Sequence, residues 1–462
     1  MTKKIYRKLN HIHMVGIGGT GMNGIAEVLL NLGYQVSGSD LQQNESTQRL
    51  ARLGADISIG HKAENVKAAD VVVISSAVRA DNVEVQRARA RLIPVIPRAE
   101  MLAELMRMKY GIAVAGSHGK TTTTSMTAVV LEAAGYDPTI IVGGRLNTIG
   151  ANAKLGAGDF IVAEADESDR SFLYLSPFIA VVTNIDEEHL DQYRSLDDIK
   201  KTFVNFANKV PFYCPVILCL DDPNLQGIIP EIERKIITYG LSAPADVSAR
   251  DFGFDGFQSS AVIFHKGNKL GDLRLQVPGL HNISNALAAT AVGLDLGIPA
   301  ETILEALRTY TGTGRRFELR KTVGDIMVIE DYAHHPTEIK ATLEAARRGW
   351  TRRVVVVFQP HRYTRLSKLM TQFATSFDQA DVLVLTEIYP AGEDPIAGVS
   401  GRALFDEVRQ FGHKNVRFEP DLKKIPALLE KISAPGDMLI ILGAGNVNRI
   451  IPEIIARLEA RS

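Results

Sequence analysis

Short apolar stretches alternate with helix-like segments along almost the whole chain. This alternation is typical of α/β folds with mostly parallel sheets. The predicted strands are His11–Val15, Gln35–Gly38, Val71–Ser75, Ile112–Ala115, Phe160–Glu164, Ile179–Asn184, Met327–Asp331, Val354–Phe358, Val382–Glu387 and Met438–Leu442. Several of them end in glycine, serine, asparagine or an acidic residue. Because ligands of such folds bind at the carboxyl ends of the strands, we expect the functional residues there.

Two breaks in this pattern divide the 462 residues into three domains. One break lies in the helix-like stretch Ala99–Lys109, and the other is the glycine-rich basic hinge Thr311–Arg316. We expect a Rossmann-like domain over 1–106, a P-loop ATPase-like parallel sheet over 107–314, and a second Rossmann-like domain over 315–462. Three domains also agree with the usual size of about 150 residues per domain.

Composition narrows the class of protein. The 52 lysines and arginines almost balance the 53 acidic residues, so no overall charge attracts the chain to nucleic acid. No apolar stretch approaches the ~18 residues of a membrane-spanning helix, and we expect a cytoplasmic protein without an export signal. Cys214 and Cys219 have no second pair or histidine cluster nearby, which favours buried reduced thiols over a zinc site.

The first glycine-rich loop, GIGGTG, begins at Gly16 between a predicted strand and the helix-like run Met22–Leu32. Its glycines would let the backbone approach a pyrophosphate, and the following helix would offer free N–H groups. A purely structural turn is the alternative, and the pattern does not specify NAD. Asp40 ends the next strand, where a carboxylate could bond a ribose hydroxyl. The residues assigned to this nucleotide site are Gly16, Gly18, Gly19, Gly21, Asp40 and Ser75.

The second loop, GSHGKT, also lies between a strand and a helix start. It is shorter than the common phosphate loop because Val114 stands where the first glycine is expected. Lys120 could reach the β- and γ-phosphates of ATP, and Thr121 could bind Mg²⁺; a chance match in a surface turn is the alternative. The residues assigned to ATP here are Gly116, Ser117, His118, Gly119, Lys120, Thr121 and Thr122. Two phosphate loops in different domains favour an enzyme that uses ATP to join a second, nucleotide-bearing substrate to something else.

Acidic residues follow the next two central strands. Glu164 ends one strand beside Asp166, Glu167 and Asp169, and is the best-placed candidate for a Mg²⁺ ligand; a solvated acidic loop is the alternative. His189 lies in the second group, with Asn184, Asp186, Glu187 and Glu188. It could bind a second metal or orient a water molecule, although histidine is not a preferred Mg²⁺ ligand and a capping role is open.

The remaining candidates lie on both sides of the hinge. Asn282 and Asn285 share one helix face, where exposed amides could bond an adenine edge or cap the helix. Arg315 or Arg316 could clamp a γ-phosphate, since arginine suits that role by geometry and charge. Each arginine alone is more often a surface charge, but such residues recur at strand ends. Those that could face ATP or hold an anionic substrate from the third domain are Asp331, His334, His335, His361, Arg362 and Arg365.

Taken together, these motifs resemble one family over essentially the whole chain. GSHGKTTTT, EADESD, TNIDEEHLD, PGLHNISNALAA, GTGRRFE and DYAHHPTE are similar to the motifs of the Mur ligases of peptidoglycan synthesis, whose members carry the short phosphate loop. The N-terminal glycine-rich region, FQPHRYTR and EIYPAGEDPI resemble the branch that acts on UDP-N-acetylmuramate and L-alanine.

The resemblance implies a role for each domain. The first would bind the UDP-sugar, the second ATP and Mg²⁺, and the third would bring in L-alanine and close on the site. The residue matches are Lys120, His189 and Arg316 for catalysis; Thr121, Glu164 and His189 for metal; Asn282, Asn285, Arg316 and Asp331 for ATP; and His361, Arg362 and Arg365 for substrate. A monomer or weak homodimer is expected.

One position departs from the family pattern. Some members carry a carbamylated lysine where this chain has Phe203, so that modification is not carried over. Three other functions stay open: a ligase for a recycled tripeptide, a nicotinamide-dependent dehydrogenase, and a non-catalytic nucleotide-sugar sensor. The dehydrogenase would leave Lys120 and Thr121 without a purpose, and the intact Lys120, Thr121, Glu164 and His189 argue against the sensor.

Overall fold

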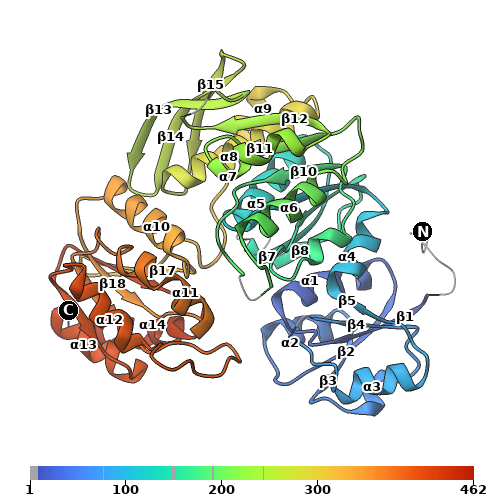
Figure 1. Ribbon diagram of the computed structural model, residues 1–462, viewed down its shortest axis with the longest axis horizontal. Coiled ribbons are helices and arrows are strands. Elements are labelled where there is room, and N and C mark those ends of the chain that lie inside the picture. The colour runs from blue at the N-terminus through green and yellow to red at the C-terminus, as the bar shows by residue number, and fades with distance from the viewer. Residues whose placement is uncertain (1–8, 76, 147–150, 190–191, 243, 462) are drawn as a thin grey trace.

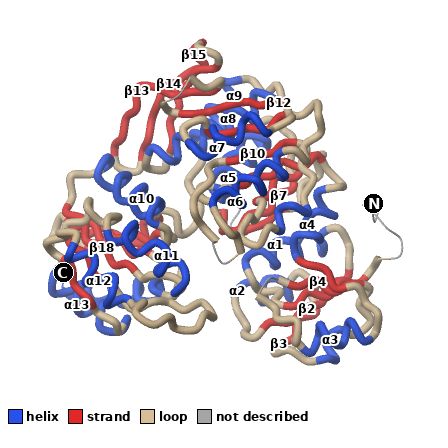
Figure 2. The backbone as a smooth tube through the Cα atoms, viewed as in Figure 1, coloured by secondary structure: helices blue, strands red, loops and turns tan. Residues whose placement is uncertain are grey.

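The computed structural model describes residues 9–75, 77–146, 151–189, 192–242 and 244–461, which form three sheets flanked by helices (Figures 1 and 2). The first sheet is parallel, with strand order β3-β2-β1-β4-β5. Its order reverses between β1 and β4, which is where ligands bind in such sheets. The strands are β1 His11–Val15, β2 Gln35–Asp40, β3 Asp56–Ile59, β4 Val71–Ile74 and β5 Val95–Pro97; the helices are α1 Thr20–Asn31, α2 Glu45–Arg52, α3 Val83–Ala90 and α4 Arg98–Met106.

The central sheet has ten strands in the order β15-β14-β13-β12-β11-β10-β6-β9-β7-β8. Strands β12, β11, β10, β6, β9 and β7 form its parallel middle. The strands are β6 Tyr110–Ala115, β7 Thr139–Leu146, β8 Ala151–Lys154, β9 Phe160–Glu164, β10 Ile179–Val182, β11 Pro215–Cys219, β12 Lys235–Gly240, β13 Val247–Asp255, β14 Gln258–His265 and β15 Asn268–Leu275. The helices are α5 Lys120–Ala133, α6 Leu196–Ala207, α7 Pro223–Ile228, α8 Leu280–Asp295 and α9 Ala300–Arg308.

The third sheet has the order β16-β17-β21-β18-β19-β20, and only its edge strand β16 is antiparallel. Its strands are β16 Glu318–Val323, β17 Ile326–Asp331, β18 Arg353–Phe358, β19 Val382–Leu385, β20 Val416–Phe418 and β21 Asp437–Leu442. The helices are α10 Pro336–Gly349, α11 Tyr363–Ala374, α12 Gly401–Gln410, α13 Ile425–Ile432 and α14 Ile451–Arg461. No helix in the described part of the chain combines the length and apolar character needed to cross a membrane.

The hydrophobic cores explain how the sheets are assembled. Along β18, Val354, Val356 and Phe358 enter one core while Val355 and Val357 enter another, so helices cover both faces of the third sheet. The first and central sheets instead share one continuous core, to which α1 and α4 contribute. The third domain meets the central one through polar side chains and an aromatic contact between Phe257, Phe317 and Trp350.

All ten predicted strands are present, with ends that differ by at most two residues, and the α/β class is confirmed. The expectation of a parallel central sheet was incomplete, because the antiparallel strands β8, β14 and β15 were not predicted. The β13–β14 hairpin turns at Gly256, whose φ of +54° favours glycine. The domain boundaries stay a prediction.

Candidate active site

The second glycine loop connects β6 to α5 at the carboxyl edge of the central sheet. Its two glycines have φ of +132° at Gly116 and +76° at Gly119, which disfavours any other residue. A Cβ at Gly116 would lie 2.1 Å from Thr183 Oγ1, and one at Gly119 would lie 2.6 Å from Asn285 Oδ1. The loop is therefore packed tightly against its neighbours, and the start of α5 directs free N–H groups to an anion.

Lys120 is held by the loop it belongs to. Its Nζ donates to the carbonyl oxygens of Gly116 at 2.5 Å and Ser117 at 2.8 Å, and to Glu167 Oε1 at 2.8 Å. Burial acts to lower the pKa of Lys120, but the Glu167 carboxylate outweighs it and raises the pKa. The loop therefore carries a fixed positive charge where phosphate oxygens would lie.

Two carboxylate oxygens at this edge of the sheet, Glu164 Oε1 and Glu167 Oε2, are buried and have no hydrogen-bond partner among the described residues. Glu164 ends β9, opposite Val114 of β6. Buried acceptors of this kind are costly unless a donor or cation meets them. They therefore fit a divalent cation, which prefers oxygen ligands.

A group of three side chains also indicates a metal site. One ligand atom from each of Glu167, Glu188 and His189 lies within 4.8 Å of the others. His189 Nε2 is 3.7 Å from both Glu167 Oε1 and Glu188 Oε2. Burial lowers the pKa of His189, which favours the neutral form that binds metal. No local pattern distinguishes Glu167 and Glu188 from their acidic neighbours in the chain.

Thr121, the predicted magnesium hydroxyl, is the second residue of α5 and lies beside β7. A Cβ at Gly144 would be 3.1 Å from Thr121 Cγ2, and one at Gly143 would be 2.7 Å from Glu164 Oε2. These two glycines therefore let β7 approach both predicted metal ligands. Thr122, the next residue of α5, is buried.

The two hinge arginines have different surroundings. Arg315 Nε donates to Glu330 at 2.6 Å and its Nη2 donates to the Gly443 carbonyl at 3.0 Å, so it is engaged within the third domain. Arg316 lies over the ring of Tyr332, and its Nη1 is 3.5 Å from Glu338 Oε1. Arg316 is therefore the less engaged of the two, and its contact with a phosphate stays a prediction.

Asp331 supports the turn that carries Arg316. Its two carboxylate oxygens accept from the backbone N–H groups of Phe317 and Ala333, each at 2.7 Å. Phe317 has a φ of +46°, an unusual conformation that such a bond stabilises. Direct contact between Asp331 and ATP stays a prediction.

Asn282 and Asn285 lie on one face of α8, but the expectation of exposed amides was wrong, since each is only 7% exposed. Asn282 Nδ2 donates to the Pro278 carbonyl at 2.7 Å, and Asn285 Oδ1 accepts from Thr123 at 3.1 Å. The amides are covered because α8 packs against α5. Asn285 supports the phosphate loop at Gly119 from behind.

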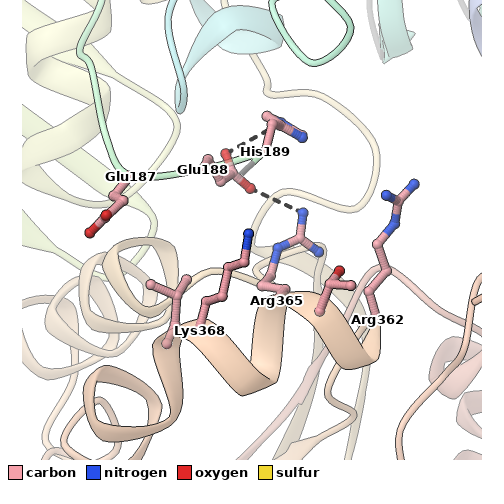
Figure 3. A pocket seen from close by; sticks show the side chains of 8 residues that line it. Glu187, Glu188, His189, Arg362, Arg365 and Lys368 are labelled. Carbon is pink, nitrogen blue, oxygen red and sulfur yellow. Dashed lines mark hydrogen bonds and ion pairs between the residues drawn. The ribbon is translucent and has the colours of Figure 1, made fainter. Parts of the chain in front are cut away.

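The predicted substrate residues at and before the start of α11 face the acidic group of the central domain (Figure 3). Arg365 Nη2 donates to Glu188 Oε1 at 3.1 Å, and its Nη1 is 3.1 Å from His361 Nδ1. Burial, together with neighbouring cations, lowers the pKa of His361 to about 3, so that ring is neutral. Arg365 and Glu188, together with His189, Arg362 and Lys368, line a pocket between the central and third domains.

A polar contact that sequence did not predict joins the phosphate loop to α10. His118 Nε2 is 3.1 Å from Asp186 Oδ2, and its Nδ1 is 3.4 Å from Glu338 Oε1. Thr337 Oγ1 donates to the same Asp186 oxygen at 2.6 Å. Burial acts to lower the pKa of His118, but the two carboxylates raise it to about 10. Both acids lie in the quoted motifs, yet no local signal indicates that they meet.

The predicted nucleotide residues of the first domain also come together. Gly16 N donates to the Ser39 carbonyl, and Gly18 N donates to Asp40 Oδ2 at 2.9 Å. A Cβ at Gly16 would lie 3.4 Å from Ser75 Oγ. Gly19 caps α1, and Gly21 lies in its first turn.

Arg98, which sequence reasoning missed, lies beside this loop. A Cβ at Gly21 would be 2.9 Å from its Nη1, and its Nη2 donates to Asp166 Oδ2 at 2.8 Å. Arg98 therefore connects the first glycine loop to the acidic loop that follows β9. An arginine in a helix carries no pattern that would have identified it.

Comparisons with known proteins identify the family. Residues 11–110 match the model "Mur ligase family, catalytic domain", residues 114–293 "Mur ligase middle domain", and residues 315–445 "Mur ligase, glutamate ligase domain". The chain is 59% identical over 457 residues to the UDP-N-acetylmuramate–L-alanine ligase of Geobacter sp. (strain M21), covering 99% of each chain. It is 57% identical over 455 residues to the ligase of the same name from Geotalea daltonii, covering 98% of this chain and 99% of the relative.

Two solved structures agree with this assignment. The Thermotoga maritima UDP-N-acetylmuramate–alanine ligase superposes with a TM-score of 0.82 at 30% identity, over 98% of this chain and 100% of that chain. The murein peptide ligase of Psychrobacter arcticus gives a TM-score of 0.72 at 25% identity, over 97% and 99%. The chain belongs to the Mur ligase family.

Proposed function

We propose that this protein is an ATP-dependent ligase that joins L-alanine to the lactyl carboxylate of UDP-N-acetylmuramate. The products would be UDP-N-acetylmuramoyl-L-alanine, ADP and phosphate, and the reaction would serve peptidoglycan synthesis in the cytoplasm. One observation carries the proposal: the phosphate-loop Lys120 and the Glu167–Glu188–His189 group lie directly opposite the Arg365 cluster of another domain. Relatives with this activity in their names match over nearly the full chain.

The first domain would hold the UDP-sugar. The glycine loop and the start of α1 would receive the pyrophosphate, as helix N-termini do for anions. Asp40 would bond the ribose and Ser75 would line the site. Gly18 N already donates to Asp40 Oδ2 at 2.9 Å, so the loop has its conformation before the ligand binds.

The central domain would hold ATP. Lys120 would exchange its carbonyl partners for phosphate oxygens, which form stronger, charge-assisted bonds. Asn282 and Asn285 would lie on the adenine side, although burial limits them to supporting contacts. From the third domain, Arg316 would neutralise charge on the transferring phosphoryl group.

Thr121, Glu164 and His189 would hold Mg²⁺, and we add Glu167 and Glu188 to this set. A bound Mg²⁺ would neutralise phosphate charge during transfer. The unpartnered oxygens of Glu164 and Glu167 support this assignment.

The reaction has two steps. The lactyl carboxylate oxygen attacks the γ-phosphorus and releases ADP, which gives an acyl phosphate. The uncharged amine of L-alanine then attacks the carbonyl carbon, releases phosphate and loses a proton. We place the carboxylate of L-alanine near His361, Arg362 and Arg365. Closure of the third domain would exclude water from the acyl phosphate.

A second candidate is a ligase for the tripeptide L-Ala-γ-D-Glu-meso-diaminopimelate, because a murein peptide ligase has a similar fold. Phosphate release from ATP and Mg²⁺ with UDP-N-acetylmuramate distinguishes the two when L-alanine, the tripeptide or no amine is added. Release that depends on L-alanine and disappears in Lys120→Ala is expected. Release only with the tripeptide would favour the second candidate, and release with neither amine would favour a nucleotide-sugar sensor. We also propose that the protein is a monomer or weak homodimer.

A further inference from the structure

Glu338 lies where three separate segments meet. It is the third residue of α10, and its side chain is 11% exposed. Its Oε1 is 3.4 Å from His118 Nδ1 of the phosphate loop and 3.5 Å from Arg316 Nη1 of the hinge. Its Oε2 is 3.1 Å from His334 Nδ1 in the loop between β17 and α10. One carboxylate thus contacts the ATP loop and the phosphoryl-binding arginine at once.

Part of this arrangement has an ordinary structural purpose. Glu338 Oε2 accepts from the backbone N–H groups of His334 and His335, which completes a capping box at the start of α10. That function uses Oε2 and requires an acceptor but no charge, since glutamine serves equally at this position. The contacts of Oε1 with His118 and Arg316 are therefore additional to capping.

The charges also agree with a coupling role. Burial acts to raise the pKa of Glu338, but His334 and His118 hold it well below the usual range. Arg316 has five N–H donors in a planar fork, so contact at Nη1 leaves others for a phosphate. Fixing one edge of the guanidinium determines where the other edge points.

We propose that Glu338 is a positioning residue for phosphoryl transfer: it orients Arg316 and, through His118, aligns that arginine with the phosphate loop when the third domain closes. The proposal rests on the proposed ligase function, because it requires Arg316 to act on the transferring phosphoryl group. Glu338 would then couple the central and third domains at the reacting phosphate, in addition to capping α10.

The test compares the wild type with Glu338→Gln, Arg316→Ala and the double variant. Glu338→Gln keeps the size and the capping acceptor, but it removes the charge and replaces the oxygen that faces His118 and Arg316 with an NH2 donor. The matched control is Glu344→Gln, which lies on the same helix and pairs with Arg348 on the surface at 2.7 Å. Amine-dependent phosphate release, binding of UDP-N-acetylmuramate and thermal unfolding are measured for each protein.

We expect Glu338→Gln to lower kcat by about 10- to 100-fold, as misplaced catalytic groups do. The KM for the UDP-sugar should stay at the wild-type value, and Glu344→Gln should behave as wild type. The Tm of Glu338→Gln should fall because the ionised carboxylate stabilises the folded state, but the variant should stay folded at the assay temperature. Adding Glu338→Gln to Arg316→Ala should lower kcat by no more than about a further twofold. A residue that acts through Arg316 has no effect on turnover when Arg316 is absent.

Three results would overturn the inference. The first is wild-type turnover in Glu338→Gln. The second is a double variant in which the two losses multiply. The third is a loss that the unfolded fraction of Glu338→Gln fully accounts for, since the role would then be capping. Failure of the proposed ligase function would appear as an inactive wild type. Failure of the positioning role alone would appear as an active wild type with one of these three results, so the two failures are distinguishable.

Discussion

Arg365 of α11 and Glu188 of the central domain are 177 residues apart in the chain, yet Arg365 Nη2 donates to Glu188 Oε1 at 3.1 Å. Both side chains are largely buried, at 10% and 6% exposure. A buried pair of this kind ties two domains together at the pocket where two substrates would meet. Removal of one partner leaves the other charge buried and uncompensated.

Arg365→Lys keeps the charge but replaces the planar fork with a single ammonium group. We expect kcat/KM for L-alanine to fall about 10- to 100-fold. This corresponds to a loss of about 1.4 to 2.7 kcal/mol of transition-state stabilisation, which is similar to the energy of a hydrogen bond to a charged group. Steady-state phosphate release at varied L-alanine measures this change. Arg409→Ala, on α12, is the control and should turn over normally. An unchanged KM and kcat in Arg365→Lys would remove this cluster from the substrate site.

Gly119→Ala and Gly135→Ala form a matched pair, because both glycines have φ near +80°. A Cβ at Gly119 would lie 2.6 Å from Asn285 Oδ1, whereas nothing lies within 4 Å at Gly135. Both changes should cost about 1–2 kcal/mol of folding stability through backbone strain. Only Gly119→Ala should also lose ATP binding, measured by calorimetry. Equal ATP affinity in both variants would show that the loop tolerates this displacement.

Acid should destabilise the first domain through Glu84, which is fully buried and accepts bonds from His13 at 2.9 Å and Ser39 at 2.7 Å. Burial acts to raise the pKa of Glu84, but these hydrogen bonds lower it from 4.5 to about 2. Because the folded pKa is below the unfolded one, the contribution is present above pH 4.5 and is lost as pH falls toward 2. The contribution is at most about 3 kcal/mol.

Chemical denaturation between pH 6 and pH 3 measures this contribution of Glu84. Glu84→Gln should be less stable near neutral pH and should lose less stability than the wild type on acidification. Parallel curves for the two proteins across that range would contradict the assignment to Glu84.

Trp350, the single tryptophan of the chain, should report domain closure. Its ring is 4.9 Å from Phe257 of the central domain and 5.5 Å from Phe317, which directly follows the hinge, measured between centroids. Closure of the third domain changes this contact, so intrinsic fluorescence should shift when an ATP analogue and UDP-N-acetylmuramate bind together. Trp350→Phe is the control, in which the signal disappears while turnover continues. Unchanged fluorescence together with unchanged X-ray scattering would contradict the closing motion.

The local elements of this protein can be predicted from short stretches of its chain. Apolar runs such as Val354–Phe358 form strands because a fully buried parallel strand is apolar on both faces. The glycines at 16, 116 and 119 mark loops because their positive φ favours glycine. The phosphate loop, the first nucleotide loop and the acidic strand ends were therefore predictable from short stretches of residues.

Which of these groups meet depends on how elements far apart in the chain pack together. Glu167 joins Glu188 and His189, Glu338 reaches His118, and Thr337 reaches Asp186 across 151 residues. The burial of Asn285 depends on how α8 packs against α5, and Arg316 differs from Arg315 only in what surrounds it. Such contacts arise from packing between elements and domains far apart in the chain, and periodicity or turn chemistry carries no information about them.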